Sequence, residues 1–193
     1  MKLTLSVLAL SLFSLPAWAN IVQNSGFETG DFTSWTASTT SSNPWLVTTF
    51  GPTVGVFSAS TGCTGQQCIT GTATQLASLS QGLTTVAGQN YVLSFLFTPN
   101  SGTPNELQVL FGNTVAFDLV NTPNTGAFVQ YSTTVNAVSN FTVLTFLGRQ
   151  DPGYDRLDSV TVNLSGTAAP EPSTFLLLGG LLPVALAIRR RVL

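Results

Sequence analysis

Short stretches in which apolar and small polar residues alternate recur along the middle of the chain, and they restrict its fold more than any other feature. YVLSFLF at 91–97 and FTVLTFL at 141–147 are the clearest examples. Alternation with a period of two places every second side chain on one face, as in a strand with one buried face. Turn-forming sequences such as PNSGTPN, NTPNTG and DPG separate the stretches.

These patterns predict an all-β domain. The predicted strands are 20–27, 45–50, 54–59, 74–79, 91–98, 106–111, 115–120, 128–135, 141–148 and 157–164. Many short strands at this spacing favour a β-sandwich, and a jelly roll is the topology that we expect.

The first 19 residues differ from this pattern. Lys2 is followed by an apolar run at 3–15, then by Pro16 and the small-x-small sequence at 17–19. This order is typical of a secretory signal peptide, here an N-terminal helix with cleavage before Asn20. A buried hydrophobic helix is the alternative. The sequence therefore predicts a protein that leaves the cytoplasm.

The charge of the region between the two ends of the chain excludes one class of partner. Residues 20–169 contain Arg149 and Arg156 as their only basic residues, against seven carboxylates, which gives a net charge of −5. Without a basic patch the chain cannot neutralise a phosphate backbone, so we expect no nucleic-acid partner.

The same region lacks the residues of most catalytic sites. It has no histidine and no lysine, which removes the usual general base and the Ser-His-Asp arrangement. Paired carboxylates, as in glycoside hydrolysis, would remain. Glu106 with Asp118, and the group Asp151, Asp155 and Asp158, are also explained as solvated or turn residues. We therefore predict that the protein is not an enzyme.

Cys63 and Cys68 are the only cysteines and lie five positions apart in GCTGQQC. An exported chain meets an oxidising compartment, so we expect a disulfide that closes a small loop. A zinc site is the alternative, but the chain offers no histidine to complete it.

The C-terminal region is a second apolar segment. Residues 175–188 are apolar apart from Gly179-Gly180 and Pro183, and Arg189, Arg190 and Arg191 follow. As a helix these 14 residues would extend roughly 21 Å, which is short of a hydrocarbon core of about 30 Å. The arginines would stay on the cytoplasmic side. The pattern predicts a short transmembrane helix that anchors the chain transiently; an ordinary anchor and a core helix are the alternatives.

Pro170-Glu171-Pro172, followed by the apolar run and the arginine cluster, resembles the PEP-CTERM sorting signal of Gram-negative bacteria. The resemblance covers about 24 residues (Pro170–Leu193). It implies recognition by an exosortase, a membrane-embedded transpeptidase that processes the chain near Pro170–Pro172. It also implies a bacterium that makes extracellular polysaccharide.

Both ends of the predicted domain resemble galactose-binding-like jelly rolls, a group that includes many carbohydrate-binding modules. NSGFETGDFTSW at 24–35 is similar to their opening strand, and LDSVTV at 157–162 is similar to their closing strand. The resemblance implies a structural calcium ion held by Glu28 and Asp158, because calcium takes six to eight hard oxygen ligands. Outer ligands would come from Asp31, Asp151 and Asp155. The alternative is that Glu28 hydrogen-bonds the following turn while Asp158 caps a strand end.

Sugar sites use aromatic rings beside a few polar groups. Trp45 follows SSNP at a loop-to-strand junction, and Tyr154 lies in DPGYDR. These two are the candidate ligand-binding residues. We expect Trp35 in the core, and Tyr91 and Tyr131 to pack against strands.

The chain is thus expected to consist of a signal peptide (1–19), a jelly-roll domain (20–164), a linker with the Pro-Glu-Pro motif (165–174) and a transmembrane helix with a basic tail (175–193). We expect the inner membrane to hold it first, with the domain in the periplasm, and the cell surface or medium to receive it after processing. The expected function is that of a non-catalytic surface or extracellular-matrix protein associated with exopolysaccharide or biofilm. The alternative is a carbohydrate-binding, lectin-like module, and a glycoside-active enzyme ranks third.

Overall fold

The computed structural model describes residues 19–38, 44–63, 76–100 and 102–166, and the statements below refer to these residues. The two apolar terminal segments, Cys68 and the Pro-Glu-Pro motif lie outside them. The described residues up to Ser165 belong to one compact unit. Within the described ranges, no helix has the length and apolar character needed to cross a membrane.

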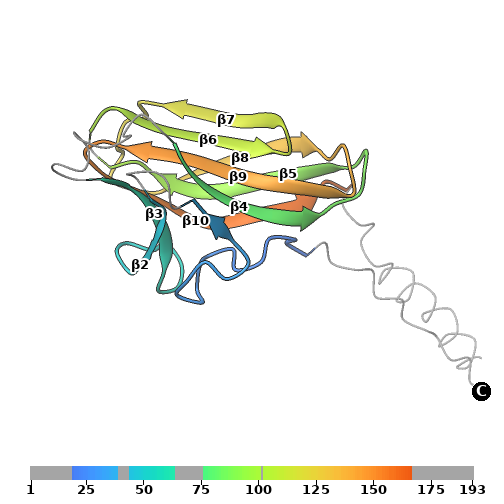
Figure 1. Cartoon of the computed structure of the whole chain (residues 1–193), viewed down its shortest axis with the longest axis horizontal. Helices are drawn as coiled ribbons and strands as arrows, with labels where there is room; N and C mark the ends of the chain where they lie inside the picture. The colour runs from blue at the N-terminus through green and yellow to red at the C-terminus, as the bar shows by residue number, and fades with distance from the viewer. Residues whose placement is uncertain (1–18, 39–43, 64–75, 101, 167–193) are drawn as a thin grey trace, which may run out of the picture. The chain divides into compact units, whose positions relative to one another are not determined.

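Two antiparallel five-stranded sheets pack face to face and form a β-sandwich (Figure 1). The first sheet, in the order β1-β4-β9-β6-β7, contains β1 (Thr36–Ala37), β4 (Ala77–Thr84), β9 (Phe141–Gln150), β6 (Asn105–Phe111) and β7 (Thr114–Val120). The second sheet, in the order β2-β3-β10-β5-β8, contains β2 (Leu46–Thr48), β3 (Ser58–Cys63), β10 (Gly153–Leu164), β5 (Asn90–Thr98) and β8 (Val129–Asn136).

The central strand of the second sheet, β10, is irregular in its middle. It pairs with β3 through its first half and with β5 through most of its length, and its register with β5 shifts between Asp158 and Thr161. Ser159, inside this bulge, has a positive φ of 52°. A bulge inserts an extra residue and redirects the neighbouring side chains, and here it lies next to the predicted calcium ligand Asp158.

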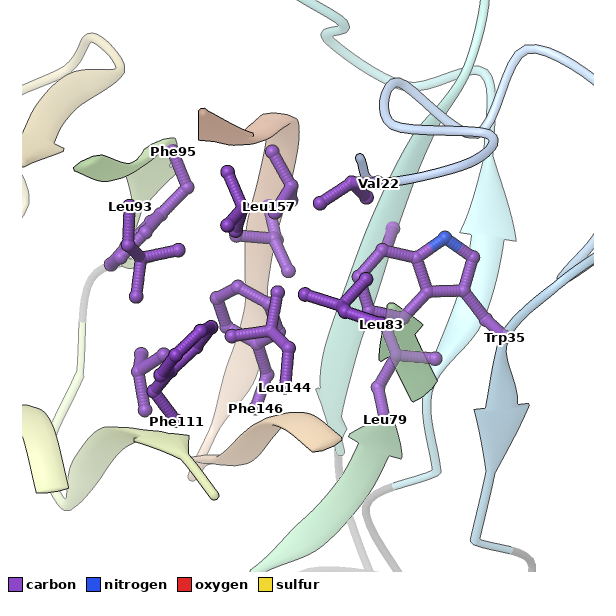
Figure 2. Close-up of a cluster of buried hydrophobic side chains, with 14 of the residues drawn as sticks. Val22, Trp35, Leu79, Leu83, Leu93, Phe95, Phe111, Leu144, Phe146 and Leu157 are labelled. Carbon is purple, nitrogen blue, oxygen red and sulfur yellow. The ribbon is translucent and has the colours of Figure 1, made fainter. Parts of the chain in front are cut away.

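The space between the sheets is filled by aromatic and branched apolar side chains (Figure 2). Phe95 of β5 and Phe146 of β9 face each other from opposite sheets with ring centroids 5.4 Å apart, edge to face. Trp35, which precedes β1, contacts Phe146 and Phe27 and is 6% exposed. The expected core position of Trp35 is therefore confirmed.

Most predicted strands overlap an observed one, but β1 was not predicted, β4 continues to Thr84 beyond the predicted 74–79, and two predicted segments are wrong. The segment predicted as a strand at 20–27 is irregular, because Asn24 and Phe27 both have positive φ angles (46° and 61°). The segment predicted at 54–59 is mostly turn, and β3 begins only at Ser58. The alternation of apolar and polar residues did not reveal that this turn folds around the carboxylate of Glu28.

The chain leaves the sandwich at one of its two ends, which we call the exit end. It is formed by the turns at 85–89, 112–113 and 137–140 together with Ser165, whose backbone N–H donates to the carbonyl of Asn90. The opposite end carries the loops that join β5 to β6, β7 to β8 and β9 to β10.

Candidate functional site

The two carboxylates predicted to hold calcium lie close together although 130 positions separate them in the sequence. Glu28 is in the opening segment and Asp158 is at the β10 bulge. A Cβ placed on Gly26 would lie 3.4 Å from Asp158 Oδ1 and 3.9 Å from Glu28 Oε1, so both carboxylates lie near Gly26. The opening and closing segments thus meet as the sequence resemblance implied.

Neutral donors satisfy both carboxylates. The backbone N–H groups of Val56 and Phe57 donate to Glu28 at 2.9 and 3.2 Å. Thr53 donates to Asp158 Oδ2 through its N–H at 3.0 Å and its hydroxyl at 2.7 Å, and the N–H of Ser159 donates to Oδ1 at 2.6 Å. Both carboxylates thus accept hydrogen bonds, as the alternative expects, Glu28 from the turn before β3 and Asp158 from Thr53 and Ser159.

The donor set fits a hard cation in its chemistry. Two carboxylates and the Thr53 hydroxyl offer oxygen ligands, and Asp158 is fully buried. Among the described residues neither carboxylate forms an ion pair; Glu28 is exposed, whereas Asp158 is buried without a positive partner. Burying unpaired charge is costly, and a bound cation would remove that cost.

The three predicted outer ligands make their contacts elsewhere. Asp31 accepts hydrogen bonds from Thr33 and Thr29, which lower the pKa of its carboxyl. Asp151 pairs with Arg149 at 2.7 Å. Within the described ranges, no three His, Cys, Asp or Glu side chains are grouped closely enough to hold a metal ion. A site at Glu28 and Asp158 would therefore depend on these two carboxylates.

Asp155 faces the interior of the sandwich. It is fully buried, its Oδ1 accepts the N–H of Asn100 at 3.0 Å, and its Oδ2 has no hydrogen-bond partner among the described residues. Burial raises the pKa of this carboxyl to about 8, against the smaller lowering effects of the Asn100 N–H and of the Arg156 charge. The carboxyl is therefore mainly protonated at pH 7.

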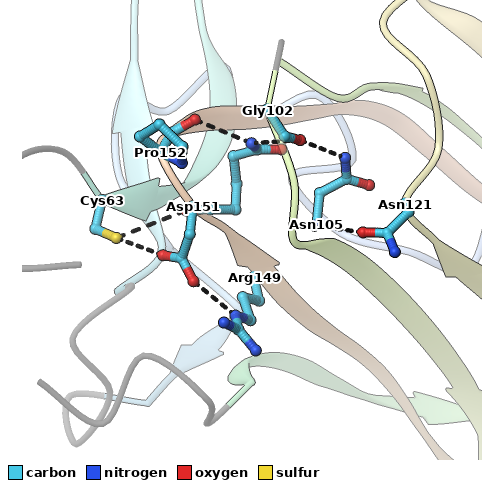
Figure 3. Close-up of polar contacts among 8 residues, drawn as sticks. Cys63, Gly102, Asn105, Asn121, Arg149, Asp151 and Pro152 are labelled. Carbon is cyan, nitrogen blue, oxygen red and sulfur yellow. Dashed lines mark hydrogen bonds and ion pairs between the residues drawn. The ribbon is translucent and has the colours of Figure 1, made fainter. Parts of the chain in front are cut away.

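A polar cluster closes the opposite end of the sandwich around Gln150 and Asp151 (Figure 3). The Gln150 side-chain amide donates to the carbonyl oxygens of Gly102 and Pro152 at 3.2 and 3.1 Å. Cys63 is disulfide-bonded, and its Sγ lies 2.6 Å from Asp151 Oδ1. Because Cys68 lies outside the described residues, the Cys63–Cys68 pairing stays a prediction.

The expectation that Trp45 presents its ring to a ligand is wrong. Its side chain is 2% exposed, and its Nε1–H donates to the carbonyl of Ala77 at 2.9 Å. The ring lies against Gly148 of β9, where an added Cβ would come within 2.8 Å of Trp45 Cζ2. The absence of a side chain at Gly148 creates the space for the indole. Trp45 is a packing residue.

Tyr154, the second candidate, does lie at a surface groove, on the outer face of β2, β3 and β10. The groove has a volume of about 310 Å³ and is lined by Leu46, Val47, Thr48, Phe50, Ser60, Tyr154 and Arg156. Tyr154 is 37% exposed and Phe50 is 72% exposed. Two aromatic rings are thus accessible beside hydroxyl groups. We call this the β2–β10 groove.

Arg156 supplies the charge of the β2–β10 groove. Its guanidinium carbon lies 4.9 Å from the centroid of the Phe50 ring, which is a cation–π contact. Its Nε is buried and donates no hydrogen bond within the described part of the chain. A guanidinium has five N–H donors in a planar fork, and Arg156 is partly exposed, so its terminal N–H groups can donate to a polar group in the groove.

Sequence reasoning missed Phe50, Leu46 and Arg156. The signal for Arg156 was present, because alternation along β10 puts Arg156 on the same face as Tyr154. No such signal existed for Phe50, which reaches the groove through the turn after β2. Its partner Arg156 is more than 100 positions away.

Comparisons with known proteins reveal similarity in structure alone. No protein-family model matches the sequence, and no curated protein matches it either.

Several solved structures have a similar fold. The CBM22-1 xylan-binding domain from Paenibacillus barcinonensis has a TM-score of 0.54 and 18% identity over 80% of this chain and 100% of that domain. TmCBM61, solved in complex with β-1,4-galactotriose, has a TM-score of 0.52 and 15% identity over 76% of this chain and 99% of that one.

The enzymatically active domain of tailspike protein 4 from bacteriophage CBA120 is also similar, with a TM-score of 0.56 and 16% identity. This chain spans about a fifth of that structure's length (21%). At these identities the likeness concerns the fold: a two-sheet β-sandwich that carbohydrate-binding modules also have.

Proposed function

We propose that the described domain is a carbohydrate-binding module and that the β2–β10 groove is its binding site. The observation that carries the proposal is the groove itself, with the rings of Phe50 and Tyr154 and the guanidinium of Arg156 on one open surface. The similar folds of the xylan-binding and galactotriose-bound domains support it by analogy.

Each groove residue has a distinct role in this proposal. The rings of Phe50 and Tyr154 offer apolar area to the C–H face of a sugar ring, and Arg156 donates hydrogen bonds to its hydroxyl groups. Open grooves with apolar walls and a few polar groups are typical of small-molecule sites. The described lining contains no carboxylate, so the ligand is expected to be a neutral or acidic glycan.

Retention on a panel of polysaccharides, including the producer's own, tests this proposal. We expect saturable binding by the parent protein and at least a tenfold weaker affinity for Phe50→Ala, since a lost aromatic contact of about 1.4 kcal/mol corresponds to a factor of ten. Tyr154→Ala and Arg156→Gln are expected to have similar effects.

Phe141→Ala is the matched control, because Phe141 is an exposed ring (62%) on the other sheet. Loss of retention in this variant alone would move the site to the other sheet. Absence of saturable retention in the folded parent protein would overturn the binding proposal for that panel, and a non-binding surface or matrix protein would then be the better description.

We further propose the export route that the sequence implies. In it, residues 1–19 direct secretion, the segment from 175 anchors the chain as a helix in the inner membrane, and an exosortase processes it near Pro170–Pro172. The support is the order of these motifs in the sequence. Mass spectrometry of the secreted protein tests it: a C-terminus beyond Arg189 would contradict processing, and a retained N-terminal segment would contradict signal cleavage.

The domain is proposed to be non-catalytic. The region 20–169 lacks histidine and lysine, and Asp155, the described carboxyl with the most strongly perturbed pKa, is buried away from the groove. Hydrolysis of any polysaccharide that is lost on substitution of one carboxylate, with folding unchanged, would contradict this.

We also propose that Glu28 and Asp158 hold a structural calcium ion, with Thr53 as a further oxygen ligand. The ion would supply the positive charge that these carboxylates lack and would join the opening segment to β10. Calcium should raise the unfolding temperature and a chelator should lower it. Asp158→Asn should remove the difference, whereas Asp118→Asn, an exposed carboxylate on β7, should keep it.

A further inference from the structure

The exit end of the sandwich carries no charge. The sequences that form it, TVAGQN at 85–90, FGNT at 111–114 and NAVSNF at 136–141, contain no acidic or basic residue. The described charged residues all lie elsewhere: Glu28, Asp31, Glu106, Asp118, Arg149, Asp151, Asp155, Arg156 and Asp158.

The same end exposes large apolar side chains. Val138 is 82% exposed, Val86 is 54% exposed, and the ring of Phe141 is 62% exposed. A hollow of about 350 Å³ lies beside them, with the amides of Asn113 and Asn136 in its wall. Exposed apolar side chains gathered on one uncharged surface indicate contact with a partner of low polarity.

The path of the chain identifies this partner. Ser165, held by its hydrogen bond to Asn90, leaves from the exit end. The sequence reaches the apolar run at 175–188 within ten residues. Nine residues between 165 and 175 span at most about 30 Å when fully extended, so an anchor in this run would hold the exit end near the bilayer.

We propose that the exit end rests on the lipid surface while the chain is anchored, with Val86, Val138 and Phe141 in the headgroup region. This inference rests on the proposed membrane anchor and is independent of carbohydrate binding. A charged surface would have to be desolvated at the bilayer, whereas this one presents apolar and amide groups. Because it carries no charge, the contact should depend neither on anionic lipid nor on salt.

A site-specific fluorophore tests the contact in the full chain. The exported chain is purified in detergent and reconstituted into vesicles of phosphatidylethanolamine with phosphatidylglycerol, or of phosphatidylcholine alone. An environment-sensitive label is attached to Val138→Cys, and to Ala127→Cys in the exposed loop between β7 and β8 at the opposite end. The parent chain without an added cysteine controls for background labelling, since Cys63 is disulfide-bonded.

We expect quenching by lipid-borne quenchers at position 138 and none at 127, equal in both lipid mixtures and unchanged by salt. Val86→Ser, introduced into the labelled Val138→Cys chain, should reduce the quenching several-fold, because the transfer of each apolar side chain favours contact about tenfold. Val120→Ser, the same change near the opposite end, should have no effect.

Three results would overturn the proposal. Equal quenching at 138 and 127 would mean that the exit end is not oriented toward the lipid. Shielding of position 138 by added polysaccharide in the absence of vesicles would make this surface a glycan site. Failure of the chain to float with vesicles would overturn both the anchor and the contact, and polysaccharide retention of the same preparation would show whether the binding proposal still stands.

Discussion

The buried carboxyl of Asp155 should make the stability of the domain fall as pH rises through neutrality. Its pKa is about 8 in the folded protein, against 3.8 for an exposed aspartate. Each unit of difference corresponds to about 1.4 kcal/mol, so the full difference amounts to about 6 kcal/mol. This is comparable with the whole stability of a typical domain, about 5–15 kcal/mol.

The free energy of unfolding falls with rising pH because the folded and unfolded states bind different numbers of protons in this range. Between about pH 4 and pH 8 the unfolded chain has lost this proton while the folded chain keeps it. The stabilising contribution of the protonated state is complete below pH 4 and is lost as pH rises to the folded pKa. Between pH 5 and pH 7, the free energy of unfolding should fall by about 3 kcal/mol.

Urea denaturation at pH 5, 6, 7 and 7.5 measures this slope. Asp155→Asn keeps an oxygen that can accept the Asn100 N–H but has no proton to lose, so it should be nearly independent of pH and more stable than the parent at pH 7.5. Asp118→Asn, which removes an exposed carboxylate, should keep the parental slope. A parental slope in Asp155→Asn would refute the assignment.

Three further substitutions test the packing and the Glu28 turn. Trp45→Phe removes the donor to the buried Ala77 carbonyl, so the free energy of unfolding measured in urea should fall by about 2 kcal/mol. A decrease below about 0.5 kcal/mol would contradict the buried placement of the indole. Gly148→Ala would put a Cβ 2.6 Å from Thr61 Cγ2 and should cost about 1–3 kcal/mol in the same assay, partly restored by Thr61→Ser. Gly55→Ala would place a Cβ at a residue with a φ of +81° and against the Glu28 carboxylate. It should lower the melting temperature and reduce the increase in melting temperature that calcium causes. An unchanged increase would mean that Glu28 does not hold the ion.

The strands that sequence alternation identified correctly are those whose two faces have different environments. In β5, β6 and β9 every second residue enters the core, so the pattern of period two is regular. The opening segment also contains apolar residues, but there the hydrogen bonds of Asn24 and the positive φ angles compete with an extended chain. Local alternation does not reveal that competition.

The site residues depended on contacts that no local pattern contains. Trp45 was expected at the surface because it follows a turn sequence, yet Gly148, about 100 positions later, provides the space that buries it. Tyr154 was expected in a loop but lies in β10, where its side chain is 37% exposed, and its groove needs Phe50 from another turn. Glu28 and Asp158 were predicted to meet through resemblance to a family, since spacing alone carries no such information.

The groove and the exit end lie at different positions along β10. Arg156 is near the start of β10 and Leu164 is at its end, so the eight residue steps from one to the other extend roughly 26 Å. If the exit end rests on lipid, the groove lies far enough from the bilayer for a polysaccharide chain to reach it. A single strand would thus connect the proposed lipid contact to the proposed glycan site, and the proposed calcium ion at Asp158 would stabilise that strand between the two. Loss of calcium should therefore weaken glycan retention without changing the lipid contact at Val138, because Asp158 precedes the bulge that separates the groove half of β10 from the exit half.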